Sequence, residues 1–199
     1  MRFSLTILLL CAASVITLAG RAENSTQPNV LLIISDDQSW GDYSFLGHPH
    51  IKTPHLDKLA GESLTYTRGY VAAPLCRPSL ASIFSGRHPH EHGITGNDPR
   101  IQSGKKAGRT NPELAPLYDA IMDRIDDEPG LAHLLGRAGY LSLQTGKWWE
   151  GDPKERGGFT HAMTHGDPKR GGRHGDAGLK ISRQGIKPIT DFIDEAGKK

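Results

Sequence analysis

Three stretches of the chain are predicted to be strands from their apolar patterns. Residues 29–35 (NVLLIIS) form a continuous apolar run that leads directly into a pair of aspartates, which is typical of a parallel strand buried on both faces. Residues 64–71 alternate enough between apolar and polar positions to form a second strand. Residues 140–144 predict a third strand, which ends just before Lys147.

Helices are predicted where apolar positions recur with helical spacing and recognisable start or stop signals are present. Thr53 is placed to cap a helix whose first residue is Pro54, and Gly139 is placed to end another. The predicted helices begin at Pro54 or cover residues 78–85, 127–138 and 188–196. The segments 95–115 and 150–178 are rich in glycine and polar residues and are predicted to be loops.

The order of these elements predicts the fold class. Strands that alternate with helices favour an α/β architecture, with a mostly parallel sheet flanked by helices. In such sheets, ligands bind beyond the carboxyl ends of the strands. Asp36, Asp37 and Lys147 all follow predicted strands, so we expect them at that edge.

Composition and charge narrow the class of protein. The 199 residues include 24 Gly and 13 Pro, and 24 basic residues nearly balance 22 acidic ones. A collagen, a disulfide-stapled miniprotein and a highly charged disordered chain are therefore excluded. The near-neutral charge gives no support to nucleic-acid binding, and the length suits one domain.

The first 22 residues have the layout of a secretory signal peptide. Arg2 supplies the positive start, residues 3–18 are apolar, and Gly20 and Ala22 are the small residues of a cleavage site. The alternative is a membrane anchor, but a run of about 16 residues is short for a membrane span. We therefore expect a secreted or periplasmic protein with no membrane attachment after cleavage.

Asp36 and Asp37 are the first candidates for chemistry. Two adjacent carboxylates at a buried strand end repel each other unless a cation neutralises them. Their hard oxygen atoms suit Ca²⁺ or Mg²⁺. The alternative is a helix cap or a solvated turn.

Cys76 and Lys147 are the next candidates. Cleavage removes Cys11 and leaves Cys76, which precedes Pro78 at a predicted helix start, a position that stabilises a thiolate or a bound oxyanion. Lys147 at a strand end is suited to holding a substrate oxyanion. The alternatives are a plain helix-initiating loop and a solvated lysine.

Histidines gather in two polar stretches of the chain. Their spacing matches no zinc site borne on a helix or assisted by cysteine. We expect one or two of them in an active site and the others in exposed loops. They are His88, His90, His92, His161, His165 and His174.

Several ordered motifs resemble those of the sulfatases. The opening segment PNVLLIISDDQSWGD resembles the start of the family, and YVAAPLCRPS resembles the signature around its modified cysteine. The other segments that carry the resemblance are KTPHLDKLA, SGRHPH and TGKW. The resemblance is dense over residues 28–95 and returns over residues 130–150.

This resemblance implies a sulfuric ester hydrolase with an alkaline-phosphatase-like fold. It implies that a formylglycine-generating enzyme oxidises Cys76 to formylglycine, whose hydrated aldehyde attacks the sulfur atom with one hydroxyl and expels sulfate with the other. It also implies Ca²⁺ bound by Asp36 and Asp37 with the modified Cys76 as a further ligand, and catalysis and sulfate binding by Lys147. The expected substrate is an aryl sulfate or a sulfated polysaccharide.

Two positions depart from the family pattern. Leu80 stands where the family has an arginine, and Trp149 stands where it has a histidine. His165 and His174 are candidates to replace that histidine in substrate binding.

Sulfatases generally run well beyond twice this length, and further metal ligands lie in their later half. Residues 23–199 are therefore expected to be the N-terminal part of a catalytic domain. Two alternatives to a sulfatase stay open. One is a phosphatase or phosphodiesterase of the same superfamily. The other is a catalytically impaired fragment or pseudoenzyme that binds sulfated glycans.

Overall fold

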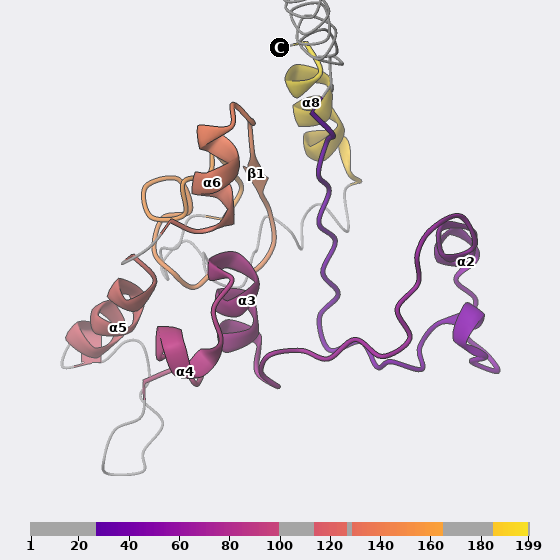
Figure 1. Ribbon diagram of the computed structural model, residues 1–199, viewed down its shortest axis with the longest axis horizontal. Helices are drawn as coiled ribbons and strands as arrows, with labels where there is room; N and C mark the ends of the chain where they lie inside the picture. Colours follow the sequence, from indigo (N-terminus) through magenta and orange to yellow (C-terminus); the bar gives the residue numbers. More distant parts are fainter. Residues whose placement is uncertain (1–26, 100–113, 127–128, 165–184, 199) are drawn as a thin grey trace, which may run out of the picture. The chain divides into compact units, whose positions relative to one another are not determined.

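The computed structural model describes residues 27–99, 114–126, 129–164 and 185–198 (Figure 1). Its contacts divide the chain into two units, residues 1–57 and 58–199. Among the described residues, no helix is both long and apolar enough to cross a membrane. The predicted signal peptide, residues 1–22, lies outside the described residues.

The first unit contains a 3-10 helix, η1 (Ser44–Leu46), and the start of α2 (Pro54–Glu62). As predicted, Pro54 is the first residue of α2 and Thr53 precedes it. Asp57 joins the two helices, because its carboxylate accepts hydrogen bonds from Ser44 Oγ at 2.6 Å and Thr53 Oγ1 at 2.7 Å. These hydrogen bonds lower the pKa of Asp57.

The prediction of a buried strand over residues 29–35 is wrong in this structure. The segment forms no strand, and its side chains are exposed, with Ile33 78% exposed. A strand needs a neighbour to accept and donate its backbone hydrogen bonds, and no described residue pairs with this segment. The strand predicted over residues 64–71 is absent for the same reason.

The described residues of the second unit contain several helices and one small sheet. Strands β1 (Leu143–Gln144) and β2 (His161–Ala162) pair in parallel, with Leu143 opposite His161. Among the residues that the structure describes after α2, the helices are α3 (Cys76–Ser85), α4 (Pro89–His92), α5 (Ala115–Met122), η3 (Asp123–Ile125), α6 (Leu131–Arg137) and α8 (Lys187–Ala196). Sequence patterns therefore located α3, α6, α8 and β1. Helices α4 and α5 were not predicted, and β2 lies in the segment 150–178 that was predicted to be a loop.

The core of this unit lies between α3, α6 and the segment after β1. Helix α3 contacts both α4 and α6. Phe84 of α3 meets the ring of Trp148 edge to face, with 5.0 Å between centroids, and Phe159 packs against both rings. The packing fixes α3 against the segment that carries Lys147, because Trp148 is its direct neighbour in sequence.

Candidate functional site

Cys76 is the first residue of α3, which begins two residues before the predicted helix of residues 78–85 and so keeps Cys76 at the helix start. Leu75 before it is extended, and Pro78 in the first turn lacks an N–H. The Arg77 backbone N–H donates to Asn97 Oδ1 at 2.9 Å, so a distant side chain caps the helix. The partly buried Cys76 thiol therefore lies at the positive end of a ten-residue helix.

Lys147 reaches this helix start from the turn after β1. Gly146 before it has a φ of 84°, a left-handed conformation that glycine adopts without strain. Lys147 Nζ donates to Cys76 Sγ at 3.6 Å and lies 5.8 Å from the centroid of the Trp149 ring. Two predicted site residues that are far apart in sequence are thus in contact, and the cation and the helix terminus both favour an anion there.

A buried ion pair lies beside this contact. Arg77 Nε and Nη2 donate to the two carboxylate oxygens of Glu150 at 2.8 and 2.7 Å. Arg77 is 1% exposed and Glu150 is 4% exposed. Burial raises the pKa of Glu150, while the Arg77 hydrogen bonds and charge oppose that rise.

His92 is the one histidine of the 88–92 group that is buried, and its ring has a defined role in packing. The Ile94 backbone N–H donates to His92 Nδ1 at 3.1 Å, so Nε2 carries the proton and donates to Ser82 Oγ at 3.1 Å. Burial, followed by the nearby Arg87 charge, lowers the pKa of His92. The ring is therefore a neutral link between α3 and α4.

Asp36 and Asp37 lie in the first unit, and both are exposed. Asp37 has a φ of 53°, which is uncommon for a residue other than glycine. Among the described residues, no three histidine, cysteine or acidic side chains gather as a metal-binding group. His165 and His174 lie outside the described residues.

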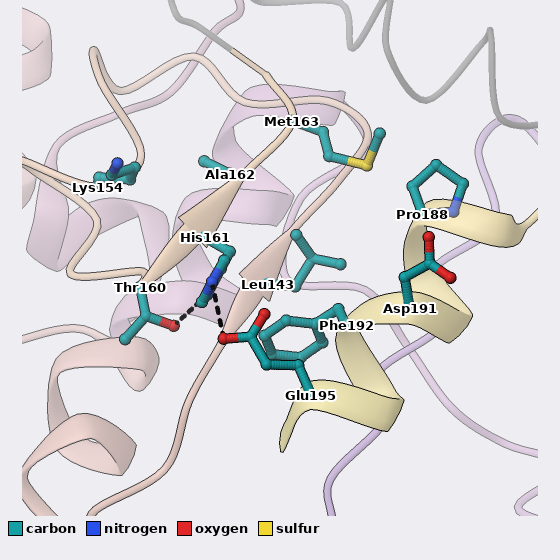
Figure 2. A pocket seen from close by; sticks show the side chains of 10 residues that line it. All are labelled: Leu143, Lys154, Thr160, His161, Ala162, Met163, Pro188, Asp191, Phe192 and Glu195. Atoms are coloured by element: carbon teal, nitrogen blue, oxygen red, sulfur yellow. Dashed lines mark hydrogen bonds and ion pairs between the residues drawn. The ribbon is translucent and has the colours of Figure 1, made fainter. Parts of the chain in front are cut away.

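A groove of about 400 Å³ lies between the small sheet and α8 (Figure 2). His161 projects into it from β2, with Thr160 Oγ1 3.0 Å from its Nδ1 and Glu195 Oε1 3.6 Å from its Nε2. Phe192 packs against the His161 ring from α8. The groove shares no lining residue with the contact between Cys76 and Lys147.

Comparison with known proteins agrees with the motifs. The sulfatase family model matches residues 28–172 of this chain. The chain belongs to the sulfatase family. Its α/β fold is therefore alkaline-phosphatase-like, and the parallel pair β1–β2 with its helices is the part that the described residues show.

Individual sulfatases match over most of this chain but only part of their own length. N-acetylgalactosamine-6-sulfatase from Homo sapiens is 36% identical over 140 residues, which cover 70% of this chain and 24% of that protein. Arylsulfatase D from Homo sapiens is 32% identical over 83% of this chain and 26% of its own length. Arylsulfatase A from Bos taurus is 36% identical over 67% of this chain and 23% of its own length. The chain thus spans about a quarter of these relatives.

The two departures from the sulfatase pattern meet in space. Leu80 and Trp149 both line a small cavity of about 10 Å³ next to the buried ion pair. Two positions that carry polar side chains in the family pattern therefore contribute apolar surface to the same cavity in this chain.

Arg77, Glu150 and Asn97 are site residues that sequence analysis missed. Arg77 lies within the signature segment YVAAPLCRPS and Glu150 lies two residues after TGKW, but a charged residue in or near a motif is usually solvated. The only available signal was an acidic residue three positions after Lys147, and that signal names no partner. Their pairing requires the folding of α3 against the segment after β1.

Proposed function

We propose that this chain is the N-terminal part of a sulfuric ester hydrolase that hydrolyses sulfate esters. Family membership supports the reaction class. The observation that carries the proposal is the 3.6 Å contact between Lys147 Nζ and Cys76 Sγ at the start of α3. A cation and a helix N-terminus at one nucleophile position form a site for an anionic ester.

Cys76 is the proposed nucleophile position. After oxidation by a formylglycine-generating enzyme, its hydrated aldehyde would supply a hydroxyl nucleophile and a second hydroxyl for sulfate release. The partial exposure of Cys76 leaves the side chain accessible to substrate. Lys147 binds a sulfate oxygen and offsets negative charge in the transition state.

Asp36 and Asp37 are the proposed Ca²⁺ ligands. Both carboxylates are exposed, and their oxygen atoms have the hard donor chemistry that Ca²⁺ prefers, so the residues fit the ion. A bound Ca²⁺ ion would neutralise negative charge on the sulfate oxygens and activate the nucleophile. The left-handed conformation of Asp37 turns the chain at this pair.

Residues 1–22 are proposed to direct export as a cleaved signal peptide, which gives a secreted or periplasmic enzyme. Aryl sulfates and sulfated polysaccharides are the proposed substrates. His165 and His174 stay candidates for substrate contacts.

Mass spectrometry of the peptide that contains Cys76 tests this proposal. The full chain is expressed with and without a formylglycine-generating enzyme, and conversion lowers the peptide mass by about 18 Da. A complete catalytic domain that contains this converted segment is expected to hydrolyse aryl sulfates with added Ca²⁺ and to leave aryl phosphates intact. Cys76→Ala and Lys147→Ala should abolish turnover. Preference for phosphates would favour a phosphatase, and an unmodified thiol would remove the mechanism.

A non-catalytic binder of sulfated glycans is the second candidate. The apolar cavity formed with Leu80 and Trp149 favours it, because these replace two polar side chains of the family site. Binding of a sulfated glycan that is retained in Cys76→Ala, without turnover by the parent chain, would establish this alternative.

A further inference from the structure

Cys76 and Lys147 meet although they belong to separate elements. Cys76 starts α3, and Lys147 follows β1 with 71 positions between them in sequence. Both side chains are only partly buried, and a lysine ammonium on a flexible stem does not by itself fix a distance. Their immediate neighbours must therefore hold the two segments together.

Arg77 connects three segments from a buried position. Its guanidinium forms a bidentate ion pair with Glu150, and its Nη1 donates to the Asn97 backbone oxygen at 3.4 Å. Its own backbone N–H is held by the Asn97 side chain. The planar guanidinium fixes direction as well as distance, because both of its bonds to the carboxylate must form in one plane.

The energetics of a buried ion pair indicate that the pair between Arg77 and Glu150 orients the segments that it joins. Removing two charges from water costs about as much as their attraction returns, so apolar residues of similar size often replace such a pair without loss of stability. Apolar side chains, however, impose no directional bonds. The pair can therefore contribute little to stability while fixing how α3 meets the segment that carries Lys147.

We propose that Arg77 and Glu150 are positioning residues that hold the Cys76 end of α3 against Lys147. Each is adjacent to, or within three positions of, one member of the contact. The catalytic meaning of this arrangement rests on the proposed sulfatase function, but the arrangement itself is testable on the unmodified thiol.

Crosslinking measures the distance directly. The full chain, produced without a formylglycine-generating enzyme, is treated with the shortest maleimide–succinimidyl ester reagent, which adds to the Cys76 thiol and acylates an amine. Mass spectrometry then gives the yield of the Cys76–Lys147 crosslink. The Arg77→Met/Glu150→Leu double variant is expected to keep the parent helical circular dichroism and urea midpoint but to lose crosslink yield several-fold.

Two further variants make the result specific. The exchanged pair Arg77→Glu/Glu150→Arg should recover part of the yield, because it restores the charge-assisted bonds. Asp191→Asn, which removes the exposed partner of Lys187 on α8, is the matched control and should leave the yield unchanged. If the apolar double variant unfolds, Glu150→Gln, which has nearly the same shape, provides the comparison.

The proposal is overturned if the folded apolar double variant gives the same crosslink yield as the parent chain. If that variant unfolds, the same yield in Glu150→Gln overturns it. This outcome is distinct from failure of the proposed function. If this chain crosslinks as expected but a complete catalytic domain that contains it hydrolyses no sulfate ester after conversion of Cys76, the sulfatase activity is refuted and the positioning role is retained.

Discussion

Two regions of this chain carry recognisable sulfatase motifs, and they differ in how their residues are held. The helix-start region, which comprises α3 and the 147–150 segment, has a buried aromatic cluster and a buried ion pair. The aspartate segment, residues 28–42, has a run of apolar side chains that are exposed. A motif thus identifies the chemistry of a segment, whereas burial depends on what that segment packs against.

Removal of the Phe84 ring is the strongest test of this comparison. Phe84→Ala should lower the free energy of unfolding by about 3–5 kcal/mol, because the ring contacts Trp148 and Phe159 in the core. Ile33→Ala, in the aspartate segment, should change it by less than about 0.5 kcal/mol. Urea unfolding followed by circular dichroism measures both. Equal losses would show that residues 28–42 are packed as firmly as the core.

Gly130 offers a smaller and more local test. A Cβ atom there would overlap the Phe84 ring, although the Gly130 backbone conformation is open to any residue. Gly130→Ala should therefore cost about 1–3 kcal/mol through overpacking alone. Gly136→Ala on α6 meets no atom within 4 Å and should instead stabilise the chain by about 0.5–1 kcal/mol. The same urea experiment distinguishes the two, and a neutral Gly130→Ala would indicate a loose contact.

The pH dependence of stability gives the finest test. Because the pKa of His92 is lowered in the folded chain, the unfolded chain binds a proton more readily. The contribution of His92 to stability should be complete above the ordinary histidine pKa of about 6.5 and fall as pH drops below it. The difference in urea midpoint between the parent chain and His92→Asn should shrink as the pH is lowered from about 7.5 to about 5, a range that spans the ordinary histidine pKa. A constant difference would contradict a neutral, buried ring.

Some of the candidate site was predictable from sequence, and the reason is that its signals are local. Pro78 predicts a helix start, so the place of Cys76 at the N-terminal end of α3 follows from its near neighbours. Lys147 follows a strand that was also predicted, β1. The contact between these two residues could only be suspected, from the rule that ligands gather at strand ends.

The sequence by itself determined the family, the start of α2, the starts of α3 and α8 to within two residues, and the chemistry available at Cys76, Lys147 and the two aspartates. These features depend on residue type and on hydrogen bonds between residues that are close in sequence, within one or two helical turns. Only tertiary structure decided that Arg77 pairs with Glu150 across 73 positions, that His92 is buried, and that residues 29–35 form no strand. Such outcomes depend on which distant segment supplies the partner, and an apolar or charged residue does not encode the position of its partner.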